Sequence, residues 1–278
     1  MKKINYMKKI NQKYLKLLLF ILLIIIFYYY FEETENYITS INTRTLDKDG
    51  FCVLYNKEYT EIYNKEIPDA EISDTEIYNK EIPNAPCKKL KEDVLSILSD
   101  NYVFIDYIYK INDGVLSTFH RDITSSKNIY NTIYPVYSLI LYKYEGKLLS
   151  ICPGSNKTYP FVWSRIVNIE GKTGTAFLFD CDLLHAGCIN NCKKRHVIQY
   201  KLCHKNDLHK LSHLHGIRSE KIDICKLSLY NTIIRKLSYY FELPINYIFY
   251  PLMIKREDKN TIIGIIQSFI PIKYYNNI

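Results

Sequence analysis

The chain has 278 residues, a formal net charge of +8, 47% hydrophobic residues and 14% aromatic residues. This length is enough to bury one good core, and the hydrophobic content excludes a wholly disordered protein. Part of the positive charge lies in the first sixteen residues, and no later segment interleaves a dense lysine or arginine stripe with aromatics. The composition therefore argues against a nucleic-acid partner.

The N-terminal segment is an apolar run, "YLKLLLFILLIIIFYYYF", from Tyr14 to Phe31. Six lysines precede its uncharged part and three glutamates follow it, and no small-residue cleavage site is present. We therefore predict that residues 1–31 form a basic tail and an uncleaved single-pass transmembrane helix (a signal-anchor), with residues 15–31 in the lipid bilayer. The positive-inside rule places the N-terminus in the cytosol and the rest of the chain on the lumenal or extracytoplasmic side.

Two further features agree with that orientation. The chain has eight cysteines, which could pair in a secretory compartment, although the sequence does not determine the pairing. Asn156-Lys157-Thr158 is an N-glycosylation sequon, which has meaning only in a lumenal domain.

A polar stalk over residues 32–49 leads into a predicted domain over residues 50–225. The decapeptide "EIYNKEIPDA" at Glu61–Ala70 recurs as "EIYNKEIPNA" at Glu76–Ala85. Two copies are too few for a solenoid. We interpret the repeat as a surface insertion at about residues 58–82, between a strand and an amphipathic helix.

That helix presents Leu90, Val94 and Leu98 on one face, because residues four apart share a helix face. Beyond it the chain contains short β-rich runs separated by turn signals. They are Tyr102–Tyr109, Gly114–His120, Pro135–Tyr144, Lys147–Cys152, Ser164–Glu170, Gly174–Asp180 and Arg195–Cys203. Many short strands with few helices between them predict a mainly β sandwich or barrel.

The last segment, residues 226–278, is mixed apolar and basic sequence. A helix is predicted around Leu227–Phe241, and three later prolines interrupt the apolar runs. We expect this extension to dock on the barrel or on a membrane surface rather than to form a second span.

Three residues have the pattern of a metal site. His120 and Asp122 are two positions apart at the end of a predicted strand, so their side chains share one face. His185 follows from a later part of the chain. Two imidazoles and one carboxylate bind Fe(II) while leaving coordination positions open, as in non-haem oxygenases. Arg195 then opens the next predicted strand, where a guanidinium can bind a carboxylate in a bidentate manner.

The sequence around these residues resembles the Fe(II)/2-oxoglutarate-dependent dioxygenases, most closely the phytanoyl-CoA dioxygenase-like branch. The matching pieces are Gly50–Leu54, the "HRD" triplet His120–Asp122, "CPGS" at Cys152–Ser155, and "GTAFLFDCDLLHAGCINN" followed by Arg195. The chain departs from that family at Asn156, where histidine is common, and in the insertion. The resemblance covers little over half of the chain.

The resemblance implies a double-stranded β-helix (jelly-roll or cupin-like) with flanking helices. It implies His120, Asp122 and His185 as the catalytic iron ligands and Arg195 as the anchor of 2-oxoglutarate. The implied activity is hydroxylation of a C–H bond using O2, with release of succinate and CO2 and with ascorbate as reductant. The substrate is open between a protein side chain, a glycan, a lipid and a small metabolite.

Two other interpretations stay open at this stage. The domain could be a catalytically inactive β-barrel binding module on its anchor. It could instead be a zinc-stabilised interaction domain, because cysteines and histidines are concentrated in one segment. These are Cys181, His185, Cys188, Cys192, His196 and Cys203. Tyr137 is a further candidate contact of 2-oxoglutarate, but in a chain with 27 tyrosines packing is the simpler interpretation of its role.

Overall fold

The structure is a computed structural model that describes residues 14–24, 37–38, 45–61, 86–113, 118–159, 166–188, 195–222 and 229–241. The chain divides into two compact units, residues 1–35 and residues 36–278. The domain boundaries expected within the second unit stay predictions, and most of the predicted insertion lies outside the described residues.

In the first unit, residues 14–24 are helical and their apolar side chains are exposed. Eleven residues span about 16 Å at the rise of an α-helix, roughly half of a bilayer's hydrocarbon thickness. Within the described ranges, no helix has the length and apolar character needed to cross a membrane. The transmembrane helix expected over residues 15–31 is therefore not supported, and its residues 25–31 lie outside the described part of the chain.

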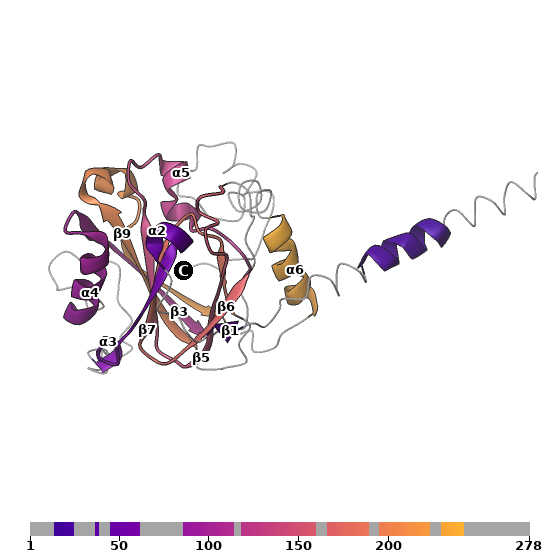
Figure 1. The fold of residues 1–278 in the computed structure, drawn as a ribbon, viewed down its shortest axis with the longest axis horizontal. Helices are drawn as coiled ribbons and strands as arrows, with labels where there is room; N and C mark the ends of the chain where they lie inside the picture. The colour runs from indigo at the N-terminus through magenta and orange to yellow at the C-terminus, as the bar shows by residue number, and fades with distance from the viewer. Residues whose placement is uncertain are drawn as a thin grey trace, which may run out of the picture. The chain divides into compact units, whose positions relative to one another are not determined.

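The described part of the second unit contains two β-sheets (Figure 1). The six-stranded sheet has the order β10-β3-β9-β4-β7-β2, and the four-stranded sheet has the order β1-β6-β5-β8. The strands are β1 (Tyr37–Ile38), β2 (Phe51–Tyr55), β3 (Tyr102–Asp113), β4 (Tyr137–Tyr142), β5 (Gly146–Ile151), β6 (Val167–Gly171), β7 (Thr175–Asp180), β8 (His185–Gly187), β9 (His196–His204) and β10 (Gly216–Ile222). The α-helices of this unit are α2 (Leu46–Asp49), α3 (Glu58–Glu61), α4 (Lys88–Leu98), α5 (Lys127–Tyr130) and α6 (Leu229–Tyr240), and the 3-10 helices are η3 (Ile123–Ser125) and η4 (Lys205–Leu211).

The main core lies between the two sheets. Tyr142 and Phe177 from the six-stranded sheet pack with Leu149 and Ile151 from the four-stranded sheet, and all four are almost fully buried. Because successive strand residues point to opposite faces, the other face of the large sheet is also apolar, and α4 covers it. The result is a mainly β, jelly-roll-like fold with flanking helices, as the sequence predicted.

Helix α4 shows how the pattern in the sequence becomes packing. Leu90 and Val94 are fully buried and Leu98 is partly buried, as the four-residue spacing predicted. Burying Leu90 and Val94 contributes about 1.5–3 kcal/mol for each side chain.

Two strand predictions need correction. The run Gly114–His120 forms no strand in its described part, where His120 makes only an isolated bridge to His185. Strand β10 was not predicted, and it extends the large sheet by pairing parallel to β3. The predicted helix around Leu227–Phe241 is confirmed as α6.

Candidate metal centre

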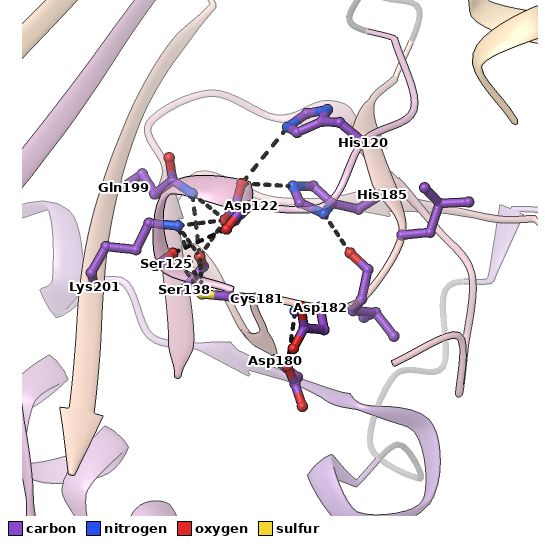
Figure 2. Close-up of polar contacts among 12 residues, drawn as sticks. His120, Asp122, Ser125, Ser138, Asp180, Cys181, Asp182, His185, Gln199 and Lys201 are labelled. Atoms are coloured by element: carbon purple, nitrogen blue, oxygen red, sulfur yellow. Dashed lines mark hydrogen bonds and ion pairs between the residues drawn. The ribbon is translucent and has the colours of Figure 1, made fainter. Parts of the chain in front are cut away.

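The structure brings the side chains of His120, Asp122 and His185 together. The Nε2 atoms of both imidazoles lie 3.7 Å from Asp122 Oδ1 (Figure 2). One ligand atom from each residue lies within 4.8 Å of the others. Asp122 and His185 are buried, whereas the His120 side chain keeps 26% of its exposure. The cluster is therefore enclosed on one side and reachable on the side of His120.

Backbone bonds hold the two histidines in register. The His120 amide donates to the His185 carbonyl at 2.9 Å, and the His185 amide donates back at 3.0 Å. Each imidazole also places Nδ1 against a carbonyl oxygen, at 2.8 Å from Thr118 and 2.9 Å from Leu183. Since a carbonyl only accepts, Nδ1 carries the proton and Nε2 keeps its lone pair for a metal.

The second carboxylate oxygen of Asp122 is fixed by three donors on the large sheet. Lys201 Nζ donates to Oδ2 at 2.6 Å and Gln199 Nε2 donates at 2.8 Å, and the Ser138 hydroxyl donates to the same atom. These donors come from β9 and β4, which are neighbouring strands. With Oδ2 occupied, Oδ1 is the oxygen that faces the two imidazoles (Figure 2).

The charges of the cluster suit a divalent cation. Burial favours a neutral Asp122, but the charge and the hydrogen bond of the Lys201 ammonium oppose it, and the pKa of the carboxyl stays below its usual value. Burial also lowers the pKa of His185 to about 4, against the opposing effect of the Asp122 carboxylate. At neutral pH the centre therefore offers a carboxylate and a neutral His185 imidazole, the forms in which these groups bind metals.

Arg195 lies directly before β9 and is 7% exposed. Its guanidinium packs on Gly187, where a Cβ atom would lie 2.3 Å from Nη2, and its charge acts on the Tyr142 hydroxyl, opposing the rise in pKa that burial causes there. Its buried Nε has no hydrogen-bond partner among the described residues. A buried cation with an unpaired donor fits a carboxylate ligand, because leaving such a group unpaired is costly.

Four residues of this region were missed by the sequence analysis: Ser138, Tyr142, Gln199 and Lys201. The sequence could have indicated Gln199 and Lys201, the two residues on β9. They lie at even spacings from Arg195, so the three side chains point to the same face. Tyr137 has the opposite parity to Ser138 and packs on the outer face of the sheet, with its ring centroid 5.4 Å from that of Tyr102. Packing is thus the role that the structure gives to Tyr137.

The loop that precedes His185 is held by Arg121, the middle residue of the "HRD" triplet. Arg121 is 1% exposed, and its Nη1 donates to the carbonyl of Ser155 at 2.9 Å and to that of Asp182. Asn156, the departure noted in the sequence, donates to Asp180 at 3.0 Å and is not a member of the ligand cluster. This departure therefore leaves the three candidate ligands intact.

The zinc interpretation finds no support in the described part of the chain. The group of potential ligands found there is His120, Asp122 and His185. Cys181 contacts Ser125 and Ser138, whereas Cys188 contacts Ser150 in the other sheet. Cys52, Cys87, Cys181 and Cys203 are free thiols, and Cys192 lies outside the described residues.

The ion pair between Lys201 and Asp122 leads to the first prediction. Replacing Lys201 by methionine is expected to lower the unfolding free energy of the metal-free protein by about 3–5 kcal/mol, because it leaves a buried carboxylate without its cation. A bound divalent cation replaces that charge, so metal should stabilise the variant more than it stabilises the wild type. Denaturant unfolding with and without Co(II) measures both effects.

The matched control is Lys89→Met, which removes an exposed lysine 2.9 Å from Asp93. This substitution should lower the unfolding free energy by no more than about 1 kcal/mol, with or without metal. If Co(II) raised the unfolding free energy of the wild type and of Lys201→Met equally, the metal would not be replacing the charge of Lys201, and the prediction would be wrong.

Searches with the sequence found no matching family model and no matching curated protein. Solved structures with a similar arrangement of strands include EvdMO1, EctD from S. alaskensis with bound Fe, and the non-heme alpha ketoglutarate dependent carbocyclase SnoK from nogalamycin biosynthesis. Their identities to this chain are 14%, 16% and 14%, and their TM-scores are 0.40, 0.42 and 0.36.

The matched regions cover 58%, 69% and 60% of this chain, and 49%, 90% and 84% of the three structures in the same order. The chain therefore spans about half the length of EvdMO1. At these identities the likeness assigns no activity, so the function must be argued from the chain's own residues.

Proposed function

We propose that this chain is an Fe(II)/2-oxoglutarate-dependent oxygenase that hydroxylates a C–H bond of its substrate. The observation that carries the proposal is the cluster of His120, Asp122 and His185, with both Nε2 atoms 3.7 Å from one carboxylate oxygen. Two imidazoles and one carboxylate bind Fe(II) and leave coordination positions open for other ligands. The phytanoyl-CoA dioxygenase-like branch is the finer form of this proposal, and it rests on the sequence resemblance.

Arg195 supports 2-oxoglutarate as the co-substrate. It directly precedes β9 and continues the strand face of Gln199 and Lys201, which contact Asp122, and its buried Nε has no hydrogen-bond partner in the described part of the chain. A dicarboxylate could thus place one end at the metal and the other end on the guanidinium. Bound Fe(II) would supply the activation of O2 that is coupled to decarboxylation of 2-oxoglutarate to succinate.

The remaining side chains orient groups and exclude water. The Phe179 ring lies 4.5 Å from the His185 ring between centroids and closes the buried side of the cluster. The partial exposure of His120 leaves access from the other side, which is where we propose that the substrate enters. Shielding of this kind limits side reactions at the metal.

Succinate production tests the proposal without knowledge of the substrate. Purified protein is incubated with Fe(II), ascorbate, O2 and 2-oxoglutarate, and succinate is measured by mass spectrometry. Slow uncoupled turnover is expected in the wild type and none in Asp122→Asn. Protein that binds Fe(II) but forms no succinate with any candidate substrate would indicate the inactive binding module, and tightly held zinc would indicate the interaction domain.

A further inference from the structure

We propose that Arg235, on helix α6, is a positioning residue that holds both histidine-bearing segments and Arg195 in their working geometry. The inference rests on the proposed function and assigns a role in it to the C-terminal extension. Arg235 is 1% exposed, although α6 is distant in sequence from the candidate ligands. Its contacts connect the helix to both sides of the metal centre.

The first contact is with the strand that carries His185. Arg235 Nη1 donates to the carbonyl of Gly187 at 2.7 Å, and Nη2 donates to the Ser150 hydroxyl at 2.6 Å. Gly187 lies at the end of β8, which begins at His185. Gly187 is also the surface on which the Arg195 guanidinium packs. A displacement of Gly187 would therefore move a candidate metal ligand and the candidate co-substrate anchor together.

The second contact is with the segment that carries His120. The Arg235 guanidinium carbon lies 4.6 Å from the centroid of the Phe119 ring, and the Phe119 amide donates to the Ser238 hydroxyl at 2.8 Å. Phe119 is 1% exposed and precedes His120 directly. One turn of α6, from Arg235 to Ser238, thus contacts both segments that form the His120–His185 bridge.

The chemistry of this position is specific to arginine. A planar guanidinium can donate to two acceptors in its plane while its face lies against an aromatic ring. A lysine keeps the charge but has a single ammonium and no planar face. If Arg235 only filled space, an apolar side chain of similar length would preserve the metal centre.

The experiment measures Co(II) and 2-oxoglutarate affinity, together with the unfolding temperature of the metal-free protein, in the full chain. Arg235→Met is expected to weaken Co(II) binding about 10-fold or more, as loss of an outer-shell partner does. The Co(II) affinity of Arg235→Lys should lie between that of Arg235→Met and that of the wild type. The matched control is Val94→Ala, which damages the core beneath α4 on the opposite face of the large sheet. It should lower the unfolding temperature and leave the Co(II) dissociation constant within about twofold of wild type, since it touches none of these contacts.

Wild-type Co(II) affinity in Arg235→Met, or equal weakening in Val94→Ala, would overturn the inference. If Arg235→Met does not fold, Ser238→Ala gives the answer. It removes the acceptor of the Phe119 amide together with the hydroxyl that donates to the Arg235 carbonyl. It should still weaken Co(II) binding about threefold if the bond to Phe119, of roughly 0.7 kcal/mol, orients His120. Unchanged affinity in Ser238→Ala would then overturn the inference. Absence of Co(II) binding in the wild type would instead refute the proposed function.

Discussion

Replacing His185 by alanine is expected to abolish succinate formation and to weaken Fe(II) binding by more than about 100-fold, the upper end of the effect of losing an outer-shell partner. The His185 imidazole is buried, and its low pKa, about 4, keeps Nε2 free of protons at neutral pH. Alanine leaves one imidazole and one carboxylate, which cannot form the three-ligand face. Isothermal titration under anaerobic conditions measures the metal affinity, and mass spectrometry measures succinate.

The matched control is His204→Ala. His204 is also a buried histidine, but it lies on β9. His204 stacks on Tyr134, with 3.8 Å between ring centroids, and lies outside the ligand cluster. It should lower stability without changing Fe(II) affinity. Retention of iron-dependent turnover in both His185→Ala and Asp122→Ala would contradict the assignment of the ligands.

Replacing Arg195 by methionine is expected to raise the dissociation constant of 2-oxoglutarate by roughly 100-fold. A charge-assisted hydrogen bond contributes about 1.5–3 kcal/mol, so loss of a two-bond contact costs at least about 3 kcal/mol. Fe(II) affinity should change little, because the Arg195 side chain is not part of the ligand cluster. The diagnostic result is a loss of 2-oxoglutarate affinity with little change in Fe(II) affinity, both measured on one preparation.

Arg218→Met provides the control for loss of an arginine. Arg218 is exposed on β10, where its guanidinium carbon lies 5.8 Å from the centroid of the Tyr107 ring. The Arg218→Met variant should bind 2-oxoglutarate with the same affinity as the wild type. An unchanged affinity in Arg195→Met would show that the co-substrate carboxylate is bound elsewhere.

The sequence was sufficient to predict the mainly β fold and the residues that form the cluster. His120 and Asp122 are two residues apart, and His185 and Arg195 lie in the segment that carries the strongest resemblance to a known family. The donors to Asp122 Oδ2 could not be predicted with the same ease. Ser138 becomes a neighbour of Gln199 and Lys201 only through the pairing of β4 with β9, which the order of residues along the chain does not specify.

Other misses have similar physical causes. The run Gly114–His120 is rich in β-forming residues, but its described end is fixed by one bridge to His185 and by α6 rather than by a sheet. Strand β10 carries charged residues at Arg218, Glu220 and Lys221, so its sequence lacks the apolar alternation of an internal strand. The hydrophobicity of the run Tyr14–Phe31 does not distinguish a membrane-spanning helix from a shorter one. Only eleven residues of this run lie in the described helix.

The central claim is that His120, Asp122 and His185 bind iron and that Arg195 binds the co-substrate. Crystals grown anaerobically with Fe(II) and 2-oxoglutarate, with diffraction recorded at the iron absorption edge, test both parts at once. The account predicts one anomalous peak within about 2.0–2.2 Å of both Nε2 atoms and of Asp122 Oδ1, distances typical of nitrogen and oxygen ligands. It also predicts the far carboxylate of 2-oxoglutarate on the Arg195 guanidinium. An iron peak elsewhere, or none at this cluster, would contradict it.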